Sequence, residues 1–378
     1  MGADSLQHAA DKITRLCAEP RDLVSLWQQS TEVLASAVPH FWAPCFYTLD
    51  PVSLLMTSHF QAGLEEFPQE WLASEYYEVD VNKIADVARS PTGISTLYDA
   101  TDGNPSSSPR WHRNMSMGGD QELVARLRTR SGEVWGAVGL YRAPDEPRFT
   151  EPEKSFIQTI APALAEGARC ALLLGQAREP EFADSPGLLI LDDHWELESA
   201  TPGVDRWLSE LPDGDPDTGR LPSSVLTLAG RVLHLAENPA RTTDIPVSRV
   251  LSRTGRWMVL HGACLTSTGD RRIAIIVEPA NPSRLYPLLM SAYGLTEREK
   301  DITKLVLQGA STSEIAAELV VSAHTVQQHL KSIFDKTGVH SRRDLVGKVF
   351  FAHYEPRFRD NERRALHDQP LRGEPWRS

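Results

Sequence analysis

The chain has 378 residues and a formal net charge of −12, and 41% of its residues are hydrophobic. This length predicts two or three domains, and the apolar fraction is high enough for each to bury a core. The N-terminus has no basic segment followed by an apolar core, and no apolar run approaches the ~18 residues that span a bilayer. We therefore expect neither export nor membrane insertion, and we predict a cytoplasmic protein.

The negative charge is unevenly distributed. Residues 294–353 carry eight Lys or Arg and seven Asp or Glu, residues 354–378 carry six and five, and residues 1–293 hold a net −14. Strong nonspecific affinity for nucleic acid needs many cations that neutralise phosphates, so the composition argues against such affinity. The four cysteines are widely spaced, which favours small buried thiols, with redox sensing as the alternative. They are Cys17, Cys45, Cys170 and Cys264.

The first 178 residues predict an α+β unit. Two amphipathic helices are followed by two strand-like runs, two further helices, a short extended run, a loop, a hairpin and a long capped helix. In chain order these segments are Leu6–Cys17, Leu23–Val38, Pro44–Leu49, Val52–Phe60, Pro68–Tyr77, Asp80–Arg89, Ile94–Tyr98, Asn104–Ser108, Gln121–Arg128 with Val134–Tyr141, and Thr150–Gln176. The long helix presents Phe156, Ile160, Leu164 and Ala168 on one side, either as a dimer seam or for packing on its own sheet.

This order of elements resembles a GAF domain. The best local match is Gly-Glu-Val-Trp-Gly-Ala-Val-Gly-Leu-Tyr-Arg at residues 132–142, followed by Phe-Thr-Glu-Pro-Glu-Lys at residues 149–154. The resemblance implies either a small-molecule site between the sheet and the mid-domain helices or a dimerisation platform. It does not identify a ligand.

The middle of this unit is rich in aromatic side chains. Tyr76, Tyr77 and Asp80 resemble the Tyr-and-Asp pattern of acyl-homoserine-lactone receptors, although Val81 stands where those receptors have proline and no Trp follows near Ile94. Aromatic residues at helical spacing also form ordinary cores, and that alternative stays open. The candidate walls of a ligand pocket are Trp71, Tyr77, Asp80 and Trp111.

Residues 185–280 predict a second α+β unit. An apolar strand that begins near Pro186, a two-residue turn and a second strand lead to a helix, then to a longer helix and three strands. The last five segments are Val204–Leu211, Ser223–Asn238, Ser248–Ser252, Trp257–Cys264 and Arg272–Glu278. This order resembles a PAS domain.

Residues 288–353 predict four short helices. Thr296 and Glu299 have capping-box spacing, Thr312 is placed to cap the second helix and Ser322 the third, and Ser341 with Asp344 would cap a fourth. Gly309 and Gly338 stand where left-handed C-terminal caps belong. The third helix buries Val326, Leu330, Ile333 and Phe334 and carries polar residues on its other side. A short helix, a turn and a longer helix are the helix-turn-helix arrangement, whose second helix enters the major groove.

Three motifs of this segment resemble the LuxR/FixJ-type (GerE) four-helix DNA-binding domain. They are Leu-Thr-Glu-Arg-Glu, Ser-x-Glu-Ile-Ala and Val-Ser-x-His-Thr-Val-x-x-His-Leu-x-x-Ile-Phe. The resemblance implies that the third helix reads bases and that the fourth helix pairs two protomers. Gln327 stands where the family often has lysine, and a merely solvated face is the alternative reading of these polar side chains. The candidate DNA contacts are Gln327, Gln328, Lys331, Thr325, Ser322, His324 and Thr312.

The sequence thus predicts a multidomain, one-component transcriptional regulator with double-stranded DNA and a second copy of the chain as partners. A small-molecule ligand and RNA polymerase are further candidate partners, and a sensor half that only binds proteins is the alternative. Phosphate-binding loop, kinase and zinc-protease motifs are absent, so we expect no enzyme, catalytic residue, cofactor or metal. Residues 354–378 have no periodicity, and we expect a disordered tail.

Overall fold

The computed structural model describes residues 3–19, 21–61, 68–174, 186–215, 218–238, 246–255, 257–266, 271–280, 293–307, 310–342 and 344–345. The chain divides into two compact units, Met1–Gly175 with Ala183–Pro279, and Gln176–Phe182 with Ala280–Ser378. Within the described residues, no helix is both long and apolar enough to cross a bilayer.

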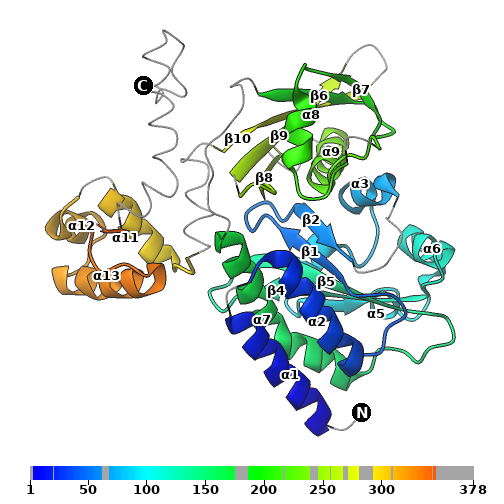
Figure 1. Ribbon diagram of the computed structural model, residues 1–378, viewed down its shortest axis with the longest axis horizontal. Coiled ribbons are helices and arrows are strands. Elements are labelled where there is room, and N and C mark those ends of the chain that lie inside the picture. The colour runs from blue at the N-terminus through cyan, green and yellow to red at the C-terminus, as the bar shows by residue number, and fades with distance from the viewer. Residues whose placement is uncertain are drawn as a thin grey trace. The chain divides into compact units, whose positions relative to one another are not determined.

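The first unit contains two five-stranded antiparallel sheets (Figure 1). The first sheet has the order β2-β1-β5-β4-β3. Its strands are β1 (Cys45–Leu49), β2 (Met56–Phe60), β3 (Ile94–Thr96), β4 (Gln121–Arg128) and β5 (Val134–Arg142). Every residue of β1 and β5 is buried, because helices cover both faces of these central strands.

Three long helices pack on one face of this sheet. They are α1 (Ala3–Ala18), α2 (Leu23–Ala37) and α7 (Glu151–Leu174). In α7, Phe156, Ile160, Leu164 and Ala168 are at most 5% exposed because they pack into the chain's own core. Of the two alternatives for this stripe, packing on the protein's own sheet is therefore the one observed.

The opposite face of the sheet carries the mid-domain helices. They are α3 (Gln69–Tyr77), α4 (Ile84–Arg89), α5 (Leu97–Ala100), the 3₁₀ turn η1 (Pro105–Ser107) and α6 (Pro109–Ser116). Glu75 on α3 accepts a hydrogen bond from the backbone N–H of Ile84 at 2.6 Å, which satisfies a donor at the start of α4. These helices bring several charged side chains onto the buried side of the sheet.

The second sheet has the order β7-β6-β10-β9-β8. Its strands are β6 (Gly187–Leu191), β7 (Leu197–Ala200), β8 (Val247–Leu251), β9 (Trp257–Thr266) and β10 (Arg271–Pro279), with helices α8 (Val204–Glu210) and α9 (Ser223–Glu237). In β10 the buried residues Ile273, Ile275 and Val277 alternate with more exposed ones, as expected for a sheet with one covered face.

Helices α3 and α9 join the two sheets by lying side by side (Figure 1). At their closest approach a Cβ on Gly230 would be only 2.1 Å from the carbonyl oxygen of Ala73, so only glycine fits there. Two polar links support this contact: the Thr227 hydroxyl donates to the Met56 carbonyl at 2.9 Å, and Asp50 accepts from the Arg249 guanidinium at 3.0 Å. The two sheets therefore pack as parts of one unit.

The second unit contains three described helices, α11 (Glu297–Leu307), α12 (Thr312–Glu318) and α13 (Ala323–Thr337). Gly338 ends α13 with a φ of 64°, which confirms the left-handed cap expected there. Ser341 accepts a hydrogen bond from the Asp344 N–H at 3.0 Å, the arrangement predicted for the start of a fourth helix. Most of that helix, Gly309 and the tail 354–378 lie outside the described residues.

Several predicted boundaries were wrong. The run Val52–Phe60 becomes a strand only from Met56, because Leu54, with a φ of 59°, turns the chain first. Ile94–Tyr98 is extended only to Thr96, whose hydroxyl caps α5. Asp80–Arg89 is helical only from Ile84, and α6 was not predicted at all.

The turn between β6 and β7 is also longer than the two residues predicted. It runs from Asp192 to Glu196, and the Asp192 carboxylate accepts the backbone N–H groups of His194 and Glu196, each at 2.9 Å. Such side-chain acceptance stabilises a wider turn and relaxes the need for glycine.

Candidate functional site

The helical module of the second unit is built around α13. Its apolar side and those of α11 and α12 form a core of nearly inaccessible side chains. These are Ile302, Val306, Ile315, Val326, Leu330, Ile333 and Leu345. The connection from α12 to α13 is tight, because Val320 adopts a φ of 53° and the N–H of Val321 returns to the Ala316 carbonyl at 2.9 Å. This turn sets the direction in which α13 leaves α12.

Glu299 joins the first helix of the module to α13. Its carboxylate accepts from the Thr296 N–H at 2.7 Å, from the Ser332 hydroxyl at 2.7 Å and from the Lys336 ammonium at 2.6 Å. Burial alone would raise the pKa of Glu299, but these hydrogen bonds outweigh it and hold the pKa below its ordinary value. The predicted capping box of Thr296 and Glu299 is confirmed, and it also fixes the pose of α13.

The side of α13 opposite the core is polar and accessible. His324, Gln327, Gln328 and Lys331 are exposed and occupy positions i, i+3, i+4 and i+7, which share one helix face. The Gln328 and His324 side chains are joined at 3.1 Å. Within the part of the chain that the structure describes, Gln327 and Lys331 have no partner. Four of the seven predicted contacts are thus brought together on one open face.

The remaining three lie at helix starts. Ser322 caps α13 as predicted: it accepts the Thr325 N–H at 3.0 Å, and the two hydroxyls are 2.8 Å apart. The cap predicted at Thr312 was wrong by one residue. Ser311 forms the capping box of α12 with Glu314, and Thr312 is the first helical residue, with its hydroxyl 3.4 Å from Arg342.

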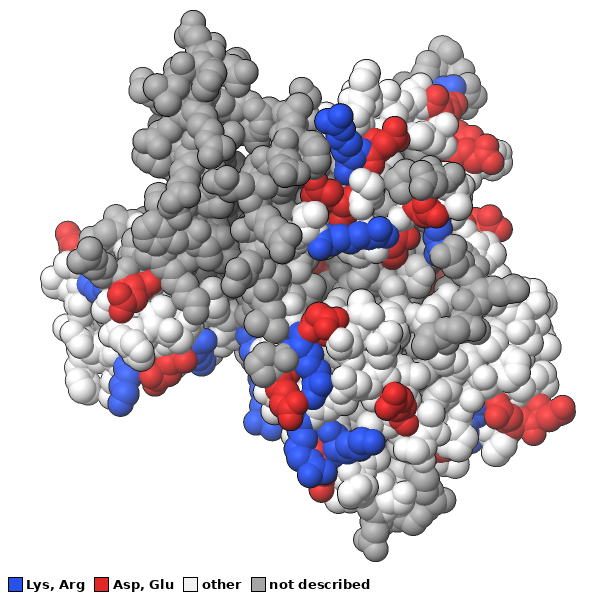
Figure 2. Space-filling model, in the orientation of Figure 1, with Lys and Arg blue, Asp and Glu red and all other residues white. Residues whose placement is uncertain are grey.

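Charges on the described surface of this module are mixed. On the face that Figure 2 shows, blue and red side chains are interspersed with white, and residues 294–353 carry eight Lys or Arg against seven Asp or Glu. A single module therefore offers few uncompensated cations for phosphates.

The first unit contains a buried ion network between its first sheet and the mid-domain helices. Arg110 on α6 reaches Glu75 on α3, and its Nε donates to Glu122 on β4 at 2.6 Å. All three side chains are at most 10% exposed. Burial alone would lower the pKa of Arg110, but the two carboxylates raise it well above its ordinary value. Arg113, paired with Glu78 and facing Asp80, lies beside this network.

A cavity of about 60 Å³ opens beside this network. Two of its lining groups are buried and have no hydrogen-bond partner among the described residues, the Oε1 oxygen of Glu122 and the Nδ2 amide of Asn114. The Tyr47 and Tyr141 hydroxyls, 3.4 Å apart, also line it. An unsatisfied buried polar group costs about 1–3 kcal/mol, so a guest that hydrogen-bonds these groups would be stabilised.

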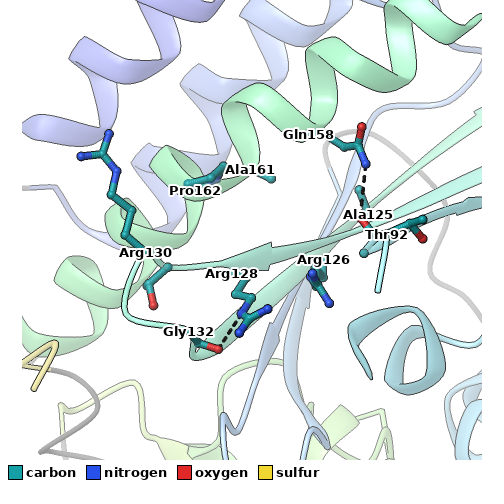
Figure 3. A pocket seen from close by; sticks show the side chains of 11 residues that line it. Thr92, Ala125, Arg126, Arg128, Arg130, Gly132, Gln158, Ala161 and Pro162 are labelled. Carbon is teal, nitrogen blue, oxygen red and sulfur yellow. Dashed lines mark hydrogen bonds between the residues drawn. The ribbon is translucent and has the colours of Figure 1, made fainter. Parts of the chain in front are cut away.

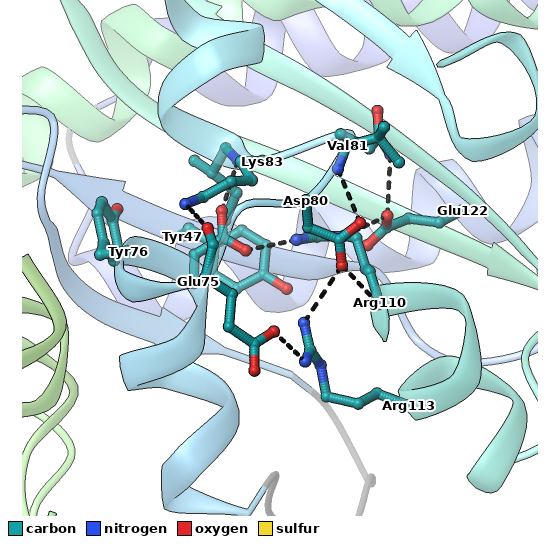
Figure 4. Close-up of polar contacts among 12 residues, drawn as sticks. Tyr47, Glu75, Tyr76, Asp80, Val81, Lys83, Arg110, Arg113 and Glu122 are labelled. Carbon is teal, nitrogen blue, oxygen red and sulfur yellow. Dashed lines mark hydrogen bonds and ion pairs between the residues drawn. The ribbon is translucent and has the colours of Figure 1, made fainter. Parts of the chain in front are cut away.

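The four residues predicted as pocket walls do not surround one cavity. Trp71 lines the cavity described above. Tyr77 instead donates to Glu237 at 2.9 Å and packs on Trp195, at the contact between the two sheets. Asp80 accepts from the Ser108 hydroxyl at 2.8 Å and faces Arg113 (Figure 4). Trp111 donates to Asp120 at 2.9 Å.

Sequence reasoning missed Glu75, Arg110 and Glu122. One available signal was a carboxylate, Glu122, at the start of a run that otherwise predicts a buried strand. A charge on a buried strand needs a partner, and this requirement points to a buried cation nearby. No such local signal marked Arg110, because its helix was not predicted. Metal ligands are not indicated either: the described residues contain no cluster of three His, Cys, Asp or Glu suited to a metal.

Residues 294–349 match the family of bacterial regulatory proteins described as the luxR family. This segment is therefore a LuxR-type helix-turn-helix domain, as its motifs predicted. The match covers the helices α11, α12 and α13 and extends beyond the last described residue.

Similar solved structures include three bacterial proteins. The Vibrio cholerae VqmA dimer, a LuxR-type receptor, is 15% identical, with 44% of this chain and 82% of that chain covered and a TM-score of 0.21. The bacteriophytochrome RpBphP3 of R. palustris is 9% identical, covers 74% and 63%, and has a TM-score of 0.32. The E. coli DhaR(N)–DhaL complex is 13% identical, covers 74% and 91%, and has a TM-score of 0.23. At these TM-scores the likenesses support no inference about the sheet-containing unit.

Proposed function

We propose that the protein is a transcriptional regulator that binds specific DNA sequences through α13. The observation that carries this proposal is the open polar face of α13 within a segment that matches the luxR family. In this role α13 lies in the major groove. Gln327 and Gln328 have amides that can pair with adenine, and Lys331 can reach guanine or a phosphate. Ser322, Thr325 and the start of α12 at Thr312 approach the phosphates, while His324 orients Gln328.

A dimer follows from the weak electrostatics of one module. Because residues 294–353 carry eight Lys or Arg against seven Asp or Glu, a single copy has few uncompensated cations to displace counterions from DNA. Two copies that read two half-sites would supply the missing affinity. RNA polymerase is the further partner that such a regulator would contact at a promoter.

The first unit is proposed as the sensor. We assign residues 1–178 to a GAF-like domain, residues 185–280 to a PAS-like domain and residues 288–353 to the DNA-binding domain. In support, each proposed sensor domain has its own five-stranded antiparallel sheet. The packing of α3 on α9 gives a physical route by which a signal in one sheet could reach the other.

The cavity beside Glu122 and Asn114 is the proposed signal site. A guest there needs a hydrogen-bond donor for the Glu122 carboxylate and an acceptor for the Asn114 amide. The cavity volume of about 60 Å³ restricts it to a compact polar molecule. The charged side chains that line the cavity are Glu75, Glu122, Arg110 and Arg113, so the unpartnered Glu122 oxygen, and not a net charge, favours an N–H or O–H donor.

A second candidate has a specific observation in its favour. The cavity between the first sheet and the mid-domain helices measures only about 60 Å³, so little volume is left for a ligand. In this alternative the first unit binds a regulatory protein and no small molecule. DNA binding by α13 is common to both candidates.

Replacement of Lys331 tests the DNA-binding role. We expect Lys331→Ala to weaken binding to the selected operator by about 1–3 kcal/mol if the ammonium makes a good base contact. The matched control is Lys304→Ala, which removes the same charge from an exposed position on α11. Fluorescence anisotropy with labelled operator and scrambled duplexes measures both effects. Equal losses for Lys331→Ala and Lys304→Ala would place Lys331 on a merely solvated face.

Native mass spectrometry of the protein from its own host separates the two sensor candidates. A signal ligand predicts a reproducible small mass increment that disappears in Asn114→Leu, because the side-chain amide then no longer donates. Stability should change little, since that Nδ2 has no partner within the described residues. A protein without the increment, isolated together with a second polypeptide, would favour the interaction platform instead.

A further inference from the structure

The second half of β4 and the following turn contain three arginines in alternation, Arg126, Arg128 and Arg130. They line a cavity of about 300 Å³ together with residues from α7 and from the segment before β3. This volume is at the lower end of the range for small-molecule sites. None of the lining residues is an Asp or Glu. The cavity is separate from the one beside Glu122, with which it shares no lining residue.

Two of these guanidinium groups are held in place by neutral partners. Arg126 donates to the carbonyls of Ala88, Ser90 and Pro91, at 3.1, 2.5 and 3.3 Å. Arg128 donates through Nε to the Gly132 carbonyl at 2.8 Å. These neutral carbonyls fix the side chains. The carboxylate of the adjacent turn, Glu133, accepts from the Thr129 and Ser131 hydroxyls, at 3.0 and 2.5 Å. Among the residues that the structure describes, no carboxylate forms an ion pair with any of the three arginines.

Glycines make room for the fixed guanidinium groups. A Cβ on Gly93 would lie 2.3 Å from Nε of Arg126, and a Cβ on Gly132 would lie 3.3 Å from an amino nitrogen of Arg128. Both glycines have positive φ, 66° and 110°, a conformation that other residues rarely adopt. The backbone is thus shaped to keep these side chains in one pose. Preorganised donors bind a charge without the entropic cost of ordering flexible side chains.

The charges also repel one another. The pKa of Arg126 is lowered by burial and by the nearby Arg128 guanidinium. Figure 3 shows Arg126 and Arg128 pointing to the same side of β4, whereas Arg130, beyond the strand end, projects in another direction. Among the described residues Arg128 has a partner only at Nε, so its two amino nitrogens are open to a guest. Arg126 is largely engaged with backbone, and Arg130 adds long-range attraction. A negative guest would relieve this repulsion.

We infer that this cavity binds a compact small molecule with at least two negative charges, a phosphate ester or a di- or tricarboxylate. Arginine forks match the geometry of both phosphate and carboxylate oxygens. The Gln158 side chain of α7, which donates to the Thr92 carbonyl at 3.2 Å, borders the same cavity. The inference does not depend on the DNA-binding role or on the cavity beside Glu122.

Calorimetric titration of the full-length protein tests it with two probes, inorganic pyrophosphate and citrate. We expect saturable binding at or below about 1 mM at physiological salt, and its weakening at high salt. Tighter binding of pyrophosphate would assign a phosphate ester, and tighter binding of citrate a carboxylate. Loss of a charge-assisted hydrogen bond in Arg128→Gln should weaken binding about tenfold or more, and Arg130→Gln should weaken it about threefold.

Arg15→Gln, at an exposed position on α1, is the control and should leave the affinity unchanged. Arg126 is not replaced because its contacts to three carbonyls hold the segment after α4. Absence of saturable binding by either probe up to about 10 mM would overturn the inference. It would also fail if Arg128→Gln bound both probes as tightly as the unchanged protein, whether or not its operator binding were weakened.

Discussion

Replacement of Arg110 by leucine should destabilise the first unit by about 3–5 kcal/mol, because it leaves two buried carboxylates without their cation. Glu75 and Glu122 are 8% and 1% exposed at the side chain, so water cannot replace the guanidinium without reorganisation of the sheet–helix contact. Calorimetric melting of the full-length protein measures the decrease in the free energy of unfolding from the transition of the first unit.

Two further variants make this expectation specific. Arg89→Leu removes an arginine whose ion pair with Asp86 is long, at 3.9 Å, and more than half exposed, so it should cost less than about 1 kcal/mol. The triple variant Glu75→Gln, Arg110→Leu, Glu122→Gln removes all three charges and should recover part of the stability. If Arg110→Leu melted like Arg89→Leu, the buried network would not be a central support of the first unit.

Replacement of Gly230 by alanine should also be strongly destabilising, by about 3 kcal/mol. The new Cβ would lie 2.1 Å from the Ala73 carbonyl oxygen, and a backbone atom cannot move aside as a flexible side chain could. Helix propensity predicts the opposite sign, because alanine is about 1 kcal/mol better than glycine inside a helix. A measured loss therefore reports the contact of α3 with α9.

The matched control on the same helix is Ala236→Gly at an exposed position. It should cost about 1 kcal/mol through propensity alone. Urea unfolding monitored by tryptophan fluorescence compares the two variants. A Gly230→Ala protein that is as stable as the unchanged chain, or more stable, would mean that the two sheets are not held together at this point.

Much of the fold was accessible from the sequence because hydrophobic periodicity is a local signal. The hairpin predicted at Gln121–Arg128 and Val134–Tyr141 agrees with β4 and β5, and Ser223–Asn238 agrees with α9 to within one residue. The errors fall where a side chain overrides the pattern. At Asp192 a carboxylate widens a turn, at Ser311 a neighbouring hydroxyl takes the capping role, and Glu75 caps α4 from a different helix.

The candidate sites also differ in whether a local sequence pattern could predict them. The face of α13 could be predicted because residues three, four and seven apart on a helix must share a side. The pocket walls could not, since Tyr77 and Asp80 are neighbours in sequence but find partners on different elements, Glu237 and Ser108. The alternation of arginines in and after β4 can be read from the sequence. The absence of Asp and Glu from the described lining of their cavity depends on which segments the fold brings together, so the sequence could not show it.

Specific DNA binding through α13 is the function on which the proposed role of the protein rests. Selection of bound duplexes from a random pool by the full-length protein, followed by anisotropy titration of the selected and scrambled sequences across a salt series, tests it most directly. We predict a two-half-site consensus, a clear preference for it over the scrambled duplex, a steep fall in affinity with salt, and a loss in Lys331→Ala that Lys304→Ala does not reproduce. Equal binding of selected and scrambled duplexes, unaffected by Lys331→Ala, would contradict the claim.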